Sequence, residues 1–125
     1  MRKKRGHIRV HEHAEGRAVH PGQWLQLAFM DEYGVSQNAL ARAMGVSARR
    51  VNEIILGRRA ITGETALLLE QATGISAQQW MAFQAEYELE LARQILTRRP
   101  PRKVVPLLPL EEPLDATDLA LHFRL

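Results

Sequence analysis

The sequence contains no cysteine, so neither disulfide bonds nor thiolate chemistry is available to this protein. No apolar run approaches the roughly 20 residues that a membrane-spanning helix needs. The basic residues at the N-terminus are not followed by a hydrophobic stretch, which argues against a secretory signal. These absences lead us to expect a cytoplasmic protein without a membrane segment.

The residue groupings that support catalysis are absent as well. The chain has no glycine-rich phosphate loop and no serine or lysine constellation around which a reaction could be built. His11-Glu12-His13 alternates imidazoles with a carboxylate, but adjacent residues on a polar arm impose no metal geometry and no HExxH pattern is present. We therefore predict no enzyme, no cofactor and no metal site.

Aromatic residues are also scarce, at 6% of the chain. Proteins that bind single-stranded RNA usually stack bases on exposed aromatic rings. Both tryptophans of this sequence, Trp24 and Trp80, lie on apolar stripes and are expected in the core. RNA binding is therefore less favoured than binding to duplex DNA.

What is present suits one small basic domain. The chain has 125 residues, a net charge of +3 and a pI near 9.8, which allows a single core. Residues 1–17 carry six Lys/Arg against two acids, whereas residues 64–95 carry five glutamates against one arginine. This asymmetry suits a protein that meets DNA with one side and a basic protein with another, although an acidic stretch is often only solvated surface.

Residues 36–59 have the layout of a DNA-binding helix-turn-helix. Ser36 is placed to cap a helix over Gln37–Met44, and Gly45-Val46-Ser47 forms a turn in which glycine allows a positive φ. Ser47 then caps a second helix, expected over Ala48–Leu56. Any two-helix hairpin shares these features, so the pattern alone leaves DNA binding and simple packing open.

The side chains of the second helix favour DNA. Val51, Ile54 and Ile55 are expected to face the core. Residues 36–59 hold five arginines and one acid, whereas a merely solvated helix face more often mixes both signs. The predicted base-reading residues are Ser47, Ala48, Arg49, Asn52 and Glu53. The predicted phosphate-binding residues are Gln37, Asn38, Arg50, Arg58 and Arg59.

Each base-reading role follows from side-chain chemistry. Arg49 can donate two hydrogen bonds to guanine, Asn52 can read adenine, and Ala48 can touch a thymine methyl group. For Glu53 two roles stay open, since its carboxylate can accept from cytosine or simply orient Arg49. The remaining contacts would fix the register of the protein on the duplex.

Two further helices are expected to pack against the motif. His20-Pro21-Gly22 opens the first, which ends at Gly34 and buries one face. The second is capped by Thr62 and ends at Gly74. The expected inward positions are Trp24, Leu25, Ala28 and Phe29 in the first, and Ala66, Leu67 and Leu69 in the second.

Ser76 and Gln79 form a capping box for a long helix that we predict from Ala77 to about Thr97. Its apolar stripe comprises Trp80, Phe83, Tyr87, Leu91 and Ile95. One small core cannot cover so many apolar side chains, and a two-fold homodimer would bury the surplus. We predict Tyr87, Leu91 and Ile95 at the dimer interface.

The chain thus divides into a flexible basic N-terminal arm (residues 1–18), a helix-turn-helix domain with a long dimerisation helix (19–98) and a Pro-rich extension (99–125). Pro100-Pro101 stops the long helix, because proline removes a donor and restricts the residue before it. The prolines that follow favour an extended strap, and residues 114–123 can form a short helix.

Several blocks of sequence, in the right order, resemble one family. They are HPG (20–22), SQNALARAMGVS (36–47), VNEIILGRRAIT (51–62), TALLLEQATG (65–74) and WMAFQAEYELELA (80–92). From Val19 to about Arg93 the chain resembles the HigA-type antitoxins, a branch of the phage-repressor-like (XRE) helix-turn-helix regulators.

The resemblance implies an all-α, five-helix lambda-repressor-like domain that dimerises through its C-terminal region. It also implies a function as the antitoxin of a type II toxin-antitoxin pair in the bacterial cytoplasm. Such a protein neutralises a small basic mRNA endoribonuclease of the HigB type, a RelE-like toxin, and represses its own operon by binding double-stranded operator DNA. The alternative is a free-standing XRE-type transcriptional regulator without a toxin.

Overall fold

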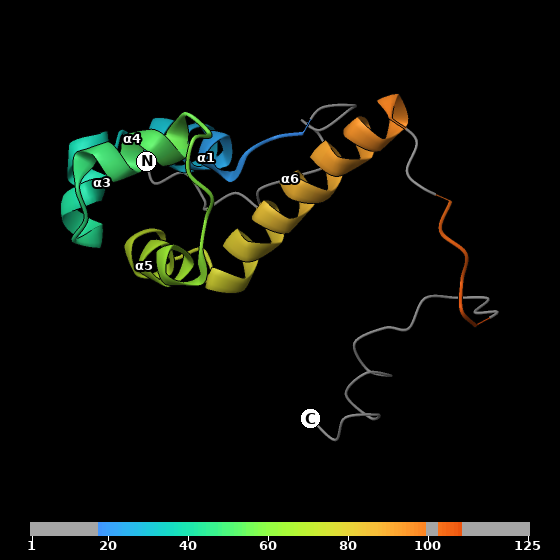
Figure 1. Cartoon of the computed structure of the whole chain (residues 1–125). Helices are drawn as coiled ribbons and strands as arrows, with labels where there is room; N and C mark the ends of the chain where they lie inside the picture. Colours follow the sequence, from blue (N-terminus) through green and yellow to red (C-terminus); the bar gives the residue numbers. More distant parts are fainter. Residues whose placement is uncertain (1–17, 100–102, 109–125) are drawn as a thin grey trace, which may run out of the picture.

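The computed structural model describes residues 18–99 and 103–108, and every regular element among them is helical (Figure 1). In chain order the elements are α1 (Pro21–Trp24), η2 (Leu25–Met30), α2 (Asp31–Tyr33), α3 (Gln37–Met44), α4 (Ala48–Ile55), α5 (Gly63–Thr73) and α6 (Ala77–Arg98). The first three follow one another without a break and form one helix. The described part of the chain therefore has five helices, as the sequence predicts.

Some predicted features lie outside the described residues. They are all of the N-terminal arm except Ala18, including His11-Glu12-His13, the double proline Pro100-Pro101 and the short helix at 114–123. Lys103–Leu108 belong to no helix or strand and are exposed throughout. The proposed division into arm, domain and extension stays a prediction.

The predicted helix ends are confirmed in atomic detail. The hydroxyls of Ser36, Ser47, Thr62 and Ser76 each accept a hydrogen bond from the backbone N–H three residues ahead. Each of these caps satisfies a backbone donor that lacks a partner within its helix. Glycines with positive φ end the first helix, α3 and α5, at Gly34, Gly45 and Gly74.

The first helix contains a π-helical turn that the sequence pattern does not reveal. The N–H of Asp31 bonds to the carbonyl of Gln26, five residues back, so one extra residue is accommodated in the turn. Met30 is consequently buried, whereas Ala28 and Phe29 are only half-buried. Phe29 packs against the core from its half-buried position, as predicted. The buried position of Met30 is the one that a period of 3.6 residues per turn does not predict.

The core lies where the first helix, the helix-turn-helix and the start of α6 meet. Trp80 is fully buried and meets Phe83 edge-on, and Phe83 stacks on Trp24 with 5.9 Å between ring centroids. In α5, Leu69 is fully buried but Leu67 is 55% exposed, so the prediction that Leu67 packs inward is wrong. At 100° per residue it is turned away from the face that carries Leu69.

Two close contacts fix the helix-turn-helix on this core. A Cβ added at Gly22 would lie 1.8 Å from the carbonyl oxygen of Ile54, so α1 touches the backbone of α4 directly. On the other side, the backbone N–H of Ile61 donates to the buried side chain of Gln84 in α6 at 2.8 Å. These contacts hold both ends of the connection between α4 and α5 in place.

The second half of α6 extends beyond the other helices (Figure 1). Tyr87 is half-buried, whereas the apolar residues after it are largely exposed. These are Leu89, Leu91, Ile95 and Leu96. Among the described helices, none is both long and apolar enough to cross a membrane.

Candidate nucleic-acid interface

The turn between α3 and α4 has the geometry of a helix-turn-helix. Gly45 ends α3 with φ of 70°, and two residues later the Ser47 hydroxyl accepts from the backbone N–H of Arg50 at 3.1 Å. Val46 is half-buried between the helices. The two helices thus pack against each other, and α4 is held with one face toward solvent.

The buried and exposed positions of α4 separate as predicted. Val51 and Ile54 are fully buried, while Ala48 and Arg49 are exposed. Asn52 is half-buried at the edge between these faces. The residues predicted to read bases therefore lie on or beside the solvent-facing side of one helix.

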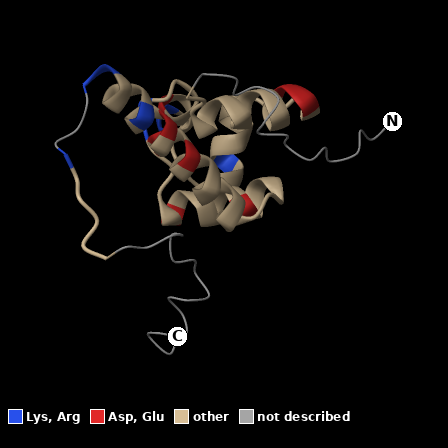
Figure 2. Ribbon diagram, turned by 90° about the vertical axis from the view of Figure 1, so that its right-hand side faces the viewer, with Lys and Arg blue, Asp and Glu red and all other residues tan. Residues whose placement is uncertain are grey.

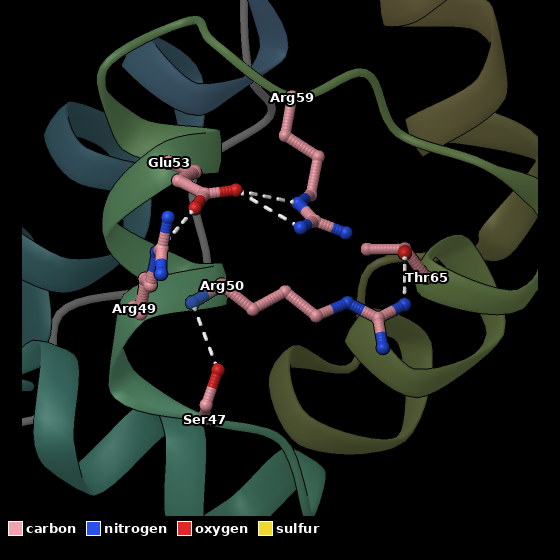
Figure 3. Close-up of polar contacts among 6 residues, drawn as sticks. All are labelled: Ser47, Arg49, Arg50, Glu53, Arg59 and Thr65. Carbon is pink, nitrogen blue, oxygen red and sulfur yellow. Dashed lines mark hydrogen bonds and ion pairs between the residues drawn. The ribbon is translucent and has the colours of Figure 1, made fainter.

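Glu53 joins two arginines on this face (Figure 3). Its carboxylate accepts a hydrogen bond from Arg49 Nε at 2.9 Å and another from Arg59 Nε at 3.0 Å. The hydrogen bonds from Arg59 and then from Arg49 lower the pKa of Glu53 below its ordinary value, so the carboxylate stays ionised at neutral pH. We call Arg49, Glu53 and Arg59 the arginine clamp.

The two arginines of the clamp are accessible to a ligand. The side chain of Arg49 is 89% exposed and that of Arg59 is 47% exposed, compared with 23% for Glu53. The carboxylate therefore lies beneath two outward-facing cations. Of the two roles left open for Glu53, this geometry favours the orientation of Arg49.

Arg50 points away from the other arginines. Its guanidinium donates to the Thr65 hydroxyl at 2.8 Å and lies 3.7 Å from the carboxylate of Glu64. Figure 3 shows the side chain running across to α5. Its predicted phosphate contact remains a prediction, but in this conformation Arg50 connects α4 to the start of α5.

The remaining predicted phosphate contacts lie around the motif. Asn38 and Arg58 are exposed, and Arg58 follows Gly57, which has φ of 73°. Gln37 is half-buried, and its side-chain carbonyl accepts from the amide of Asn52 at 3.1 Å. This bond fixes the orientation of the Asn52 amide. Gln37, predicted to bind phosphate, therefore lies next to Asn52, predicted to read a base.

The acidic region predicted from the sequence lies mostly on α6. Glu86, Glu88 and Glu90 follow one another along this helix, and basic positions lie nearer its end (Figure 2). Arg93 is 3.5 Å from Glu90. Basic residues thus outnumber acidic ones on α4 and in the loop that follows it, and acidic residues dominate the middle of α6.

The predicted dimer residues differ in their surroundings. Leu91 and Ile95 are 39% and 54% exposed, so both are available to a partner. Tyr87 instead packs within the domain, because its ring meets that of His20 with 4.9 Å between centroids.

His20 is a residue of this region that we did not single out from the sequence. Its side chain is buried, and Nδ1 accepts the backbone N–H of Gly22 at 2.9 Å as the cap of α1. The pKa of His20 is lowered by burial, an effect that its backbone hydrogen bond with Arg59 partly opposes. The available signal was its position directly before Pro21, where a capping side chain is expected.

Together the fold and the exposed face of α4 define a helix-turn-helix regulator of the phage-repressor-like class, not an enzyme. Residues 27–80 match the family described as helix-turn-helix. The described residues contain no group of three or more potential metal ligands.

Comparisons with known proteins identify the branch. The chain is 43% identical over 77 residues to virulence-associated protein I of Dichelobacter nodosus, covering 62% of this chain and 71% of that protein. It is 33% identical over 73 residues to antitoxin HigA-1 of Vibrio cholerae, covering 58% and 69%. The structure of Pseudomonas aeruginosa antitoxin HigA with the higBA promoter superposes with a TM-score of 0.67 and 39% identity, covering 74% of this chain and all of that chain. The protein belongs to the HigA antitoxin family of helix-turn-helix proteins.

Proposed function

We propose that this protein is a sequence-specific operator-binding repressor and the antitoxin of a type II toxin-antitoxin pair. The observation that carries the DNA-binding half is the arginine clamp on the solvent-facing side of α4. It presents two cations next to the amide of Asn52 on the second helix of the motif, the helix that enters the major groove in helix-turn-helix proteins. The HigA relative whose structure contains the higBA promoter supports the same conclusion.

In this proposal the N-terminal part of α4 reads the bases. Arg49 donates to the acceptor edge of a guanine, and Asn52, held by Gln37, reads an adenine. Ala48 contacts a thymine methyl group, and Ser47 lies at the helix start where its exposed side faces the groove. Glu53 orients Arg49 by accepting the hydrogen bond from its Nε.

Phosphate contacts would set the register. Arg58 and Arg59 follow the C-terminal end of α4, and Gln37 and Asn38 begin α3, where Gln37 bonds to Asn52 of α4. Contacts of this kind position the protein on any duplex without selecting a sequence. Binding across the promoter would repress transcription by occluding it.

A homodimer through the exposed half of α6 would present two reading helices to paired half-sites. Leu91 and Ile95 are exposed on this helix. A helix that extends from its domain gains stability mainly by packing an apolar face, and a second copy supplies such a face by two-fold symmetry.

The antitoxin half of the proposal rests on family membership. The partner would be a small basic HigB-type, RelE-like toxin in the bacterial cytoplasm, and the protein would associate with the nucleoid when bound to DNA. The acidic middle of α6 offers charge complementarity to a basic partner. Without a toxin, the same domain would act as a free-standing XRE-type regulator.

Selection from a library of random DNA duplexes tests the DNA-binding half. We expect the purified full chain to enrich one sequence made of two related half-sites about one helical turn apart. Failure to enrich any sequence would contradict the proposal. We refer below to the enriched DNA as the selected duplex and to a shuffled version of it as the scrambled duplex.

Capture of partners from the native host tests the antitoxin half. We expect the tagged chain to bring down a small basic protein whose expression alone arrests growth and whose coexpression with this chain restores it. Recovery of the homodimer alone would instead favour the free-standing regulator.

A further inference from the structure

The side chain of Arg50 runs from α4 to the start of α5 (Figure 3). Its Nη2 donates to the Thr65 hydroxyl at 2.8 Å, and the same nitrogen lies 3.7 Å from the carboxylate of Glu64. The side chain of Arg50 is 23% exposed and Thr65 is 1% exposed, so the bond between them is largely shielded from water. A shielded hydrogen bond is electrostatically stronger than one on an open surface.

Both ends of this bond are fixed by helix caps. Thr62, the cap of α5, donates to Thr65 Oγ1 at 3.2 Å and accepts the backbone N–H of Thr65 at 3.3 Å. The backbone N–H of Arg50 donates to the hydroxyl of Ser47, the cap of α4, at 3.1 Å. The bond therefore joins the capped first turn of α4 to the capped first turn of α5.

This contact lies next to residues that we propose to read bases. Arg50 directly follows Ala48 and Arg49 in the first turn of α4. Two other contacts of α4, at Asn52 toward α3 and at Ile54 toward α1, lie further along the helix. A recognition side chain has to be held within about 0.5 Å of its productive position. The bond from Arg50 to α5 limits how far the first turn of α4 can move.

The conformation of Arg50 does not suit a phosphate contact. Arginine typically binds phosphate through two parallel N–H groups of its planar guanidinium. Nε of Arg50 is buried and has no hydrogen-bond partner among the described residues, and Nη2 is bonded to Thr65. The side chain of Glu64 is 75% exposed, and its carboxylate would repel a phosphate at this place. Arg50 thus makes its contact within the protein.

We propose that Arg50 is a positioning residue for sequence recognition, which holds the first turn of α4 on α5 through Thr65 and does not bind a phosphate. This inference rests on the proposed DNA-binding function. It has two rivals, which are a phosphate contact by Arg50 and a bond that stabilises the fold alone. The three roles differ in their effects on the preference for the selected over the scrambled duplex and on the salt dependence of binding.

Three single variants and one double variant separate these roles. Arg50→Met keeps the apolar stem of the side chain and removes the guanidinium. Thr65→Val keeps the shape of the side chain and removes the hydroxyl, and Thr65 is too deeply buried to touch DNA itself. Thr65→Ser is the matched control, because it keeps the hydroxyl. Fluorescence anisotropy with both duplexes over a salt series measures binding, and urea denaturation measures the free energy of unfolding.

If Arg50 acts through Thr65, Arg50→Met and Thr65→Val each lower the preference about fivefold, and the double variant loses less than about twofold more than either single variant. Thr65→Ser keeps the preference of the wild type. Binding of Arg50→Met to the scrambled duplex stays within about twofold of the wild type, and its salt dependence does not lose a phosphate contact.

Three other outcomes would each overturn the inference. If Arg50→Met weakens binding to both duplexes alike and reduces the salt dependence by about one phosphate contact, Arg50 binds a phosphate. If both single variants keep the preference and lose only free energy of unfolding, the bond serves the fold alone. If their losses add in the double variant, the two residues act separately.

Arg50→Met alone tests the inference if Thr65→Val does not fold, because an unchanged preference or a reduced salt dependence in that variant contradicts it. If no duplex is enriched at all, the proposed DNA-binding function fails, which is a separate result.

Discussion

Glu53 is the one acid among residues 36–59, and its role is clear only at the scale of single side chains. A carboxylate on a surface that faces a polyanion lowers affinity through repulsion. Here it is partly neutralised, since Arg49 and Arg59 both donate to it. In the proposed complex, this arrangement would weaken the attraction to any DNA, and it would hold two arginines in defined positions.

Replacement of Glu53 by glutamine should therefore separate affinity from specificity. In the proposed complex, Glu53→Gln removes a negative charge near the phosphates, so binding to the scrambled duplex should strengthen roughly two- to fivefold and become more sensitive to salt. The preference for the selected duplex should fall, because the neutral amide oxygen of glutamine holds Arg49 less firmly than a carboxylate does. Anisotropy titrations with both duplexes at several salt concentrations measure this, and a preserved preference would contradict the role assigned to Glu53.

The buried imidazole predicts a dependence of folding stability on pH. Burial lowers the pKa of His20 in the folded protein, whereas in the unfolded chain the pKa of histidine is about 6.5. Below pH 6.5 the unfolded state therefore binds more protons at this residue, and stability falls until the pH reaches the folded pKa. Above pH 6.5 this contribution is fully present.

Urea unfolding between pH 7.5 and pH 5 checks this expectation. The free energy of unfolding should decrease over that interval in the wild type and decrease less in His20→Asn. The other four of the five histidines are common to both proteins, so the difference reports on His20. An identical pH dependence in the two proteins would contradict the assignment.

At the scale of helices, capping residues and glycines close in the sequence were sufficient to predict where most helices begin and end. Ser36, Ser47, Thr62 and Ser76 were all predicted as caps, and all four accept the expected bond. A cap involves residues within one turn, so it can be recognised from neighbouring letters. The glycines that end helices can be recognised in the same way, because a positive φ is a conformation that glycine adopts readily and other residues rarely do.

Contacts between distant segments could not be predicted in this way. Arg50 bonds to Thr65, and Gln84 bonds to Ile61, across 15 and 23 residues of sequence. His20 reaches as far as Tyr87. No local pattern shows that the side chain of Arg50 turns inward to α5, so its bond to Thr65 could not be predicted from the sequence.

The contact between α1 and α4 gives the sharpest prediction at this scale. In Gly22→Ala the new Cβ would collide with the Ile54 carbonyl, 1.8 Å away, and the obstacle is backbone. The helices must move apart, which we expect to cost about 1 to 3 kcal/mol of unfolding free energy. Urea denaturation measures the loss.

Gly63→Ala is the matched control, because a Cβ there meets nothing within 4 Å. It lies at the start of α5, where alanine is a better helix former than glycine by up to about 1 kcal/mol. Its stability should be unchanged or higher. If both variants lose the same free energy of unfolding, the close contact at Gly22 is not the cause of the loss.

For the whole molecule, the central expectation is that two copies act together. Ile95→Glu places a charge on the exposed half of α6, and the proposed dimer should then dissociate. Leu67→Glu, at a position of similar exposure on α5, should remain dimeric. Sedimentation equilibrium distinguishes these outcomes.

Loss of the dimer should also weaken DNA binding, since each copy would hold only one half-site. The effective concentration of the second copy is worth roughly 100-fold or more in affinity, so Ile95→Glu should bind the selected duplex correspondingly more weakly. A dimeric Ile95→Glu protein would place the interface elsewhere.

The most direct test of the proposed DNA-binding surface compares the base-reading role of Arg49 with the phosphate-binding role of Arg58. Arg49→Ala and Arg58→Ala are compared with the wild type on the selected duplex, on each of its single-base-pair variants and across a salt series. Arg49→Ala should lose about 1 to 3 kcal/mol and become indifferent to one base pair. Arg58→Ala should weaken binding to every duplex alike and reduce the salt dependence by about one phosphate contact. If the two variants behave identically on every duplex, the exposed face of α4 is not the surface that reads the sequence.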